Sequence, residues 1–201
     1  GLVNDFNDPE QGKEVLTQAI ESCKTGADYA TLAASAAEIF PDDNLGTTVY
    51  QAAEKQIETG LEMGSLAKEA VAALGDKEYA ASLFGKAKDM LESGEDLMKL
   101  ATMIMEALAD KELTLATYQR ASELFSTYKE FFELAGAVLK DTKNKDYAGQ
   151  IYKKAVETNP DTPSMVAVAE QLADSIGDGE GAIEVLHQAE NSVKTNAEFQ
   201  V

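Results

Sequence analysis

The side chains that most often carry catalysis or hold metals are scarce in this sequence. It contains one histidine, His187, and one cysteine, Cys23. A catalytic thiol needs a neighbouring base, and a structural zinc ion needs about four Cys or His ligands. We therefore expect Cys23 to be a buried structural thiol and His187 to be an exposed polar side chain. No catalytic residue, metal site or cofactor is predicted.

Carboxylates are abundant, but their placement does not favour acid–base catalysis. Pairs such as Asp42-Asp43 and Glu95-Asp96 fall at expected helix starts and on polar faces, whereas such catalysis needs two carboxylates in contrasting environments within one concave site. The segment 177–181, Gly-Asp-Gly-Glu-Gly, superficially suggests a phosphate or calcium loop. It lacks both the Gly-Lys-Ser/Thr ending of the first and the twelfth-position Glu of the second. We interpret it as a junction between repeats.

The elements that would position any site form a repeat with a period of 34 residues. Five blocks align without a gap, at 7–40, 41–74, 75–108, 109–142 and 143–176, and a partial block covers 177–201. Block position 13 is always alanine: Ala19, Ala53, Ala87, Ala121, Ala155 and Ala189. Position 10 is large and apolar or aromatic: Leu16, Tyr50, Phe84, Tyr118, Tyr152 and Leu186. We interpret 1–201 as a single repeat domain.

Each block predicts two amphipathic helices, because apolar positions recur at helical spacing in both of its halves. Block position 2 suits a helix N-cap, and it holds Asp8, Asp42, Asp76, Asp110, Asn144 and Asp178. Block position 20 holds Gly26, Gly60 and Gly94, which we expect to end the first helix in a left-handed conformation. The fifth block has Asn-Pro-Asp-Thr-Pro at 159–163 instead. We expect a longer and stiffer turn there.

The spacing Ala80-x3-Phe84-x2-Ala87, repeated as Ala148-x3-Tyr152-x2-Ala155, resembles the second-helix signature of tetratricopeptide repeats, whose period is also 34. The Leu-Ala pairs, such as Leu100-Ala101, lie near that family's first-helix Leu-Gly pair. The sequence departs from the family in its helix-to-helix offset and in lacking Trp and the late proline. The resemblance implies an all-α, right-handed solenoid of antiparallel helix-turn-helix hairpins, of tetratricopeptide-like, Sel1-like or another solenoid type.

Both ends of the sequence stay in register with the repeat. Residues 1–6 match the end of a preceding second helix, and Phe199 falls where another second helix should begin. Two hypotheses follow: the chain is an excerpt of a longer array, or its half-repeats are caps. Neither end shows the polar outer face of a terminal repeat, so we expect end-to-end self-association.

The resemblance also implies a groove. In tetratricopeptide arrays the first helices line a concave surface, and on this chain the second helix of each block takes that place. The candidate peptide-binding residues occupy two variable positions of these helices: Gly64, Lys68, Met98, Thr102, Phe132, Gly136, Val166 and Glu170. Met98, Thr102 and Phe132 form an apolar centre suited to a peptide anchor. The alternative is that these residues pack against the neighbouring hairpin.

Charge narrows the range of partners. The 36 acidic residues against 17 Lys and Arg give a net charge of −19, which disfavours nucleic acid and anionic membranes and attracts a cationic partner. There is no span of the roughly 20 apolar residues that a transmembrane helix needs and no signal peptide, so we expect a cytoplasmic protein. The leading hypothesis is a non-enzymatic scaffold that binds a protein or peptide. A structural spacer or self-association segment, and an accessory domain of a larger enzyme, are the alternatives.

Overall fold

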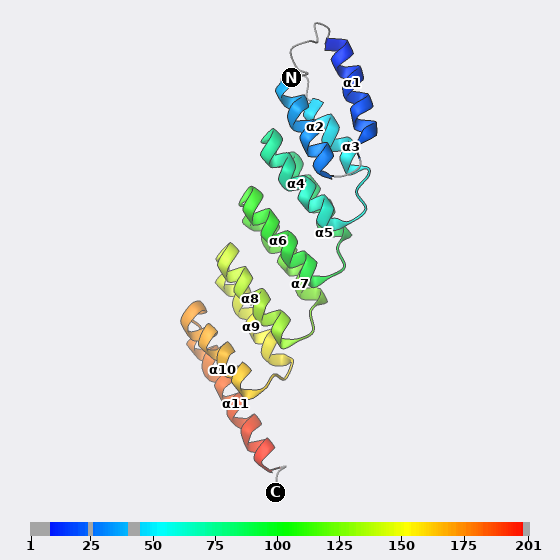
Figure 1. Ribbon diagram of the computed structural model, residues 1–201. Helices are drawn as coiled ribbons and strands as arrows, with labels where there is room; N and C mark the ends of the chain where they lie inside the picture. Colours follow the sequence, from blue (N-terminus) through cyan, green and yellow to red (C-terminus); the bar gives the residue numbers. More distant parts are fainter. Residues whose placement is uncertain (1–8, 24–25, 40–44, 199–201) are drawn as a thin grey trace. The chain divides into compact units, whose positions relative to one another are not determined.

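The computed structural model describes residues 9–23, 26–39 and 45–198, and every regular element among them is helical (Figure 1). The α-helices are α1 (Pro9–Ser22), α2 (Gly26–Ile39), α3 (Leu45–Glu54), α4 (Gly60–Leu74), α5 (Lys77–Met90), α6 (Gly94–Leu108), α7 (Lys111–Leu124), α8 (Tyr128–Thr142), α9 (Lys145–Glu157), α10 (Thr162–Glu170) and α11 (Gly179–Glu198). A π-helical segment, η1 (Gln171–Ile176), continues α10. The all-helical architecture expected from the sequence is confirmed for the described residues.

The chain divides into two compact units. The first comprises residues up to Leu91 together with Lys99–Leu113, and the second comprises Glu92–Met98 and the chain from Thr114 onward. In the first unit α2 packs on α3 and α4 packs on α5; in the second, α8 packs on α9 and α10 packs on α11 (Figure 1). Each pair joins the second helix of one sequence block to the first helix of the next block.

Short turns follow α4, α6, α8 and η1, and one residue in each of these turns is left-handed. Gly75 and Gly177 have φ values of +68° and +89°, and the matching residues Ala109 and Lys143 have φ values of +53° and +61°. The next residue then caps the following helix. Asp76 accepts from the Tyr79 amide at 2.9 Å, and the three corresponding caps lie on later helices: Asp110, Asn144 and Asp178. The predicted caps are confirmed at these four positions, whereas Asp8 and Asp42 lie outside the described residues.

The glycines at block position 20 have a different role from the one expected. Gly26, Gly60 and Gly94 are the first residues of α2, α4 and α6, and neither Gly60 nor Gly94 has a positive φ. A Cβ added to Gly60 would lie 2.6 Å from Leu91 Cγ, and one on Gly94 would lie 2.2 Å from the Phe125 ring. The prediction of left-handed helix ends was therefore wrong at Gly60 and Gly94, because close packing against the next helix explains these glycines.

Most of the predicted small and large residues lie in the core. Ala53, Ala87, Ala121 and Ala155 are fully buried, which lets neighbouring helices approach closely. The large residues three positions earlier are also buried from Leu16 to Tyr152, but Leu186 on α11 is 43% exposed.

Two features at the C-terminal side depart from the regular pattern. The turn between α9 and α10 has four residues, longer than the three-residue turns after α5 and α7 but shorter than the five-residue turn after α3. The final helix α11 continues through Asn196 to Glu198, so the turn that would precede a new helix near Phe199 does not form. Phe199 itself and residues 1–6 lie outside the described residues.

Candidate functional site

The predicted groove residues lie in pairs, one helical turn apart, on four helices. Each pair therefore shares one face of its helix. Their exposure differs: Lys68, Thr102, Val166 and Glu170 are exposed, Met98, Phe132 and Gly136 are half-buried, and Gly64 is buried. Thr102 belongs to the first unit together with Gly64 and Lys68, and the other five residues belong to the second unit.

In the first unit the two candidate residues of α4 contact α6. A Cβ on Gly64 would lie 2.6 Å from Leu100 Cδ1 and 3.3 Å from Met103 Sδ, so Gly64 provides space for helix packing. Lys68 Nζ lies 2.6 Å from Glu106 Oε2, and both side chains are about half exposed. At these two positions the structure matches the alternative in which the residues pack against the neighbouring hairpin.

The second unit has a different arrangement, an aromatic cluster that links three helices. The ring centroid of Phe132 on α8 lies 5.4 Å from that of Tyr128 and 5.3 Å from that of Tyr152 on α9. The Tyr128 hydroxyl donates to the Ser164 carbonyl on α10 at 3.3 Å. Burial raises the pKa of both tyrosines, so the rings stay neutral at physiological pH.

Gly136 leaves space beside this cluster. A Cβ at this position would meet only the Tyr152 hydroxyl, at 3.7 Å, which is an ordinary contact distance. The half-buried Phe132 ring lies one turn before Gly136 on the same face of α8. We refer to Tyr128, Phe132, Gly136 and Tyr152 as the aromatic site. Tyr128 was not among the residues predicted from the sequence, although its four-residue spacing from Phe132 places both rings on one face of a helix. Tyr152 was predicted only as one of the large residues at block position 10.

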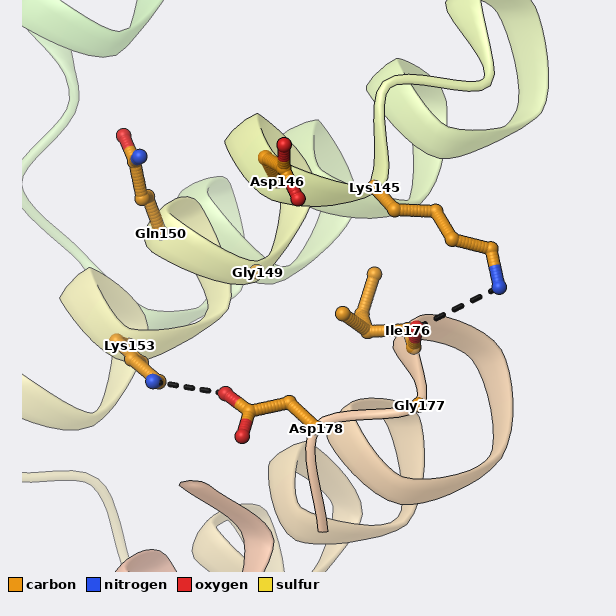
Figure 2. A pocket seen from close by; sticks show the side chains of 8 residues that line it. All are labelled: Lys145, Asp146, Gly149, Gln150, Lys153, Ile176, Gly177 and Asp178. Carbon is orange, nitrogen blue, oxygen red and sulfur yellow. Dashed lines mark hydrogen bonds and ion pairs between the residues drawn. The ribbon is translucent and has the colours of Figure 1, made fainter. Parts of the chain in front are cut away.

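A cleft of about 530 Å³ lies between α9 and residues 176–178, where η1 ends and the turn to α11 begins (Figure 2). Lys153 Nζ lies 2.8 Å from Asp178 Oδ2, and Lys145 Nζ donates to the Ile176 carbonyl at 3.4 Å. Asp178 also caps α11 through the Gly181 amide at 2.8 Å. The hydrogen bond from Lys153, followed by that from Gly181, lowers the pKa of Asp178. Both lysines of this cleft therefore hold the turn at 176–178.

The remaining candidates for chemistry are dispersed. Cys23 is half-buried rather than fully buried, and its thiol donates to the Ala19 carbonyl at 3.4 Å. Burial and the nearby Asp28 raise its pKa, which makes it a poorer nucleophile. His187 is exposed on α11 as expected. Glu95 and Asp96 lie in the first turn of α6, where the helix dipole favours negative charge, and Asp42-Asp43 lies outside the described residues.

The described residues contain neither a metal-binding group nor a membrane-spanning helix. No three His, Cys, Asp or Glu side chains are grouped so that they could hold a metal ion. Within the same part of the chain, none of the helices has both the length and the apolar character required to cross a bilayer.

Comparison with known proteins does not assign the chain to a family. No family model matches the sequence, and no curated protein is significantly similar to it.

Proposed function

We propose that this protein is a non-enzymatic scaffold, a right-handed solenoid of tetratricopeptide-like hairpins that binds a peptide or a peptide-like segment of a partner protein. The spacing of the helices supports the repeat. The helices α4, α6, α8 and α10 begin at Gly60, Gly94, Tyr128 and Thr162, with 34 residues between successive starts. The left-handed turn residues Gly75, Ala109, Lys143 and Gly177 recur at the same interval.

The observation that carries the binding function is the aromatic site. A partly exposed aromatic ring beside a helix position without a side chain gives an apolar surface into which a partner side chain can insert. The Tyr128 bond to α10 and the ring contacts to α9 hold Phe132 in place before any ligand binds, so little side-chain entropy is lost on binding. Exposed Val166 on α10 adds apolar area in the same unit.

The site can be tested by filling the space beside Gly136. Gly136→Leu places an isobutyl group beside Tyr152 and should block the site, whereas Gly85→Leu on α5 is the matched control, since a Cβ there meets nothing within 4 Å. Both changes replace a glycine inside a helix and should not lower helix stability. Phe132→Ala is a second variant that removes the ring rather than filling the space.

A random peptide library displayed on phage supplies the ligand. Peptides selected on the wild-type chain should bind Gly136→Leu and Phe132→Ala at least about tenfold more weakly, the loss expected when one apolar anchor is excluded. Their affinity for Gly85→Leu should equal that for the wild type. Selected peptides that bind all four proteins equally, or a failure to select any peptide, would contradict a peptide-binding function at this site and favour a structural spacer.

A further inference from the structure

In the first unit an ion pair joins the second helices of two successive blocks. Lys68 Nζ on α4 lies 2.6 Å from Glu106 Oε2 on α6, across 38 residues of chain. Lys68 is at position 28 of its block, and Glu106 is at position 32 of the next block. These two block positions therefore place a cation and an acid of neighbouring helices together.

The same two positions in the second unit hold the acid but not the lysine. They are Gly136 on α8 and Asp174 in η1. Asp174 is exposed, and among the described residues no cation is paired with it. Lys140, one turn after Gly136, has a side chain that is 82% exposed and is paired with Asp141 at 4.0 Å instead. The second unit thus lacks a cation of its own where the first unit has Lys68.

Space is open where the missing side chain would lie. A Cβ on Gly136 would meet only the Tyr152 hydroxyl, so no atom of α10 or η1 lies within 4 Å of it. The hydrogen bond from Tyr128 to the Ser164 carbonyl nevertheless holds α8 and α10 together. The half-buried Phe132 ring lies one turn before Gly136 on the same helix face. A side chain from another molecule can therefore enter beside Gly136 and reach this ring.

The chemistry of the surroundings favours a side chain that is aliphatic along its length and cationic at its end. Lys and Arg pack their methylene groups on apolar surfaces and keep the charged group in a polar environment. The faces of aromatic rings such as Phe132 also attract cations. An apolar side chain would use the rings alone, whereas a cationic one would use the rings and the carboxylate of Asp174. Asp174 also belongs to a π-helical segment, a feature that is frequent at functional sites.

We infer that the aromatic site binds a Lys or Arg side chain of the partner peptide. This side chain takes the place that Lys68 has in the first unit: its methylene groups pack on Phe132 beside Gly136, and its charged end pairs with Asp174. The inference rests on the proposed peptide-binding function and adds the chemical class of the anchoring residue. Because the pair is local, binding should depend on Asp174 more than on other acids of the same unit.

The probes are the peptides that phage display selects on the wild-type chain. Each should contain a Lys or Arg whose replacement by norleucine, an unbranched aliphatic residue without charge, weakens binding about fivefold, the loss of one partly exposed ion pair. Asp174→Asn should weaken binding of the unchanged peptide by a similar factor. The norleucine peptide should bind the wild type and Asp174→Asn equally, because the ion pair is absent in both complexes.

The matched control is Asp146→Asn on α9. Asp146 is another exposed acid of the second unit, and this variant has the same net charge as Asp174→Asn. It should bind the unchanged peptide as the wild type does. A charge exchange is the second test: Asp174→Lys should bind the unchanged peptide more weakly than Asp174→Asn does, and it should prefer a peptide with Glu at the anchoring position.

Two results would overturn this inference while leaving peptide binding at the aromatic site intact. In one, the peptides lose affinity for Gly136→Leu and Phe132→Ala but bind Asp174→Asn as tightly as the wild type. In the other, Asp174→Asn and Asp146→Asn weaken binding equally, which would indicate general attraction to an acidic surface. Peptides that bind Gly136→Leu and Phe132→Ala as tightly as the wild type would instead contradict the proposed function itself.

Discussion

Two buried tyrosines occupy the same block position in the two compact units, yet their hydroxyl groups have different surroundings. In the second unit, Tyr118 on α7 donates to Asp141 Oδ2 on α8 at 2.6 Å. In the first unit, the hydroxyl of fully buried Tyr50 on α3 has no hydrogen-bond partner. The residue of α4 that corresponds to Asp141 is Ala73. Glu69 lies one turn earlier on that helix and also has a buried oxygen without a partner.

This difference shows that the repeat determines where a tyrosine ring packs, but it does not determine which residue forms a hydrogen bond with the tyrosine hydroxyl. The packing position is set by many small contacts along the chain, whereas the hydrogen bond depends on one side chain of the next helix. An unpaired buried hydroxyl is destabilising, and a hydrogen bond to a carboxylate is stabilising. The two units should therefore respond in opposite ways to the loss of the same oxygen.

The largest effect is expected from Tyr118→Phe. Removing a hydrogen bond to a charged group and leaving Asp141 without that donor should lower the free energy of unfolding by about 2 kcal/mol. Urea unfolding followed by circular dichroism measures the loss, and hydrogen exchange should place it in α7 and α8. A loss equal to that of Tyr50→Phe would remove the distinction between the units.

Substitutions at the left-handed turn residues should change the free energy of unfolding equally in the two units, because the backbone conformation is the same there. Gly75→Ala in the first unit and Gly177→Ala in the second should each lower the free energy of unfolding by about 1 kcal/mol, because a Cβ is unfavourable at positive φ. The reverse change, Ala109→Gly, should stabilise the chain by up to about 1 kcal/mol, since Ala109 has a φ of +53°. If Ala109→Gly lowers the free energy of unfolding, the extra conformational entropy that glycine gives the unfolded chain outweighs the strain that it relieves at positive φ.

Tyr50→Phe should leave the stability at pH 7 unchanged or raise it by up to about 1 kcal/mol, since it removes an unpaired buried hydroxyl. It should also alter the alkaline response. Burial, followed by the charge of Glu69, raises the pKa of Tyr50 from 10.0 to about 12. The unfolded chain thus ionises first, and the stability contributed by neutral Tyr50 is complete below pH 10 and is lost as the pH rises through about 12.

Urea midpoints near pH 9 and near pH 12 measure this prediction. The decrease between them should be smaller in Tyr50→Phe than in the wild type. Some decrease should remain, because burial and the charge of Glu54 also raise the pKa of Tyr79. An identical decrease in both proteins would mean that Tyr50 is not ionised differently in the folded and unfolded states.

The smallest effect concerns a second matched pair of tyrosines. Tyr79 on α5 donates to Glu54 on α3 at 3.4 Å, and Glu54 is also paired with Lys86. Tyr147 on α9 donates instead to Ser122 Oγ on α7 at 3.0 Å. Lys86→Met should lower the free energy of unfolding by about 0.5 kcal/mol at low salt and by less in 1 M NaCl. A control, Lys88→Met, should show no comparable salt dependence if the ion pair is the cause.

The sequence pattern was sufficient for those features that many residues determine together. Helical periodicity predicted the helices, and the polar residues Asp76 and Asn144 at block position 2 predicted their starts. Glycine is required at Gly75 by a positive φ and at Gly60 by close helix contact. Sequence periodicity could not distinguish these two reasons, because both select the same amino acid. Likewise, the exposure of Lys68 and the burial of Gly64 depend on residues of another helix, 36 or more positions away in the chain. The binding role of the predicted groove residues remains a prediction.

The close contact of Gly60 has a consequence for how such a protein can be rebuilt. Gly60 and Leu91 lie in the same pair of helices, α4 and α5, so their fit moves with that pair when it is copied or exchanged. The bond from Tyr79 to Glu54 joins α5 to a helix of the preceding pair, and this match is lost when the neighbour changes. The packing inside a hairpin therefore depends on that hairpin alone, whereas its hydrogen bonds to the neighbouring hairpin depend on the residues of that neighbour. A chimera that exchanges the α4–α5 hairpin should retain its internal packing and need redesign where the hairpin meets α3 and α6.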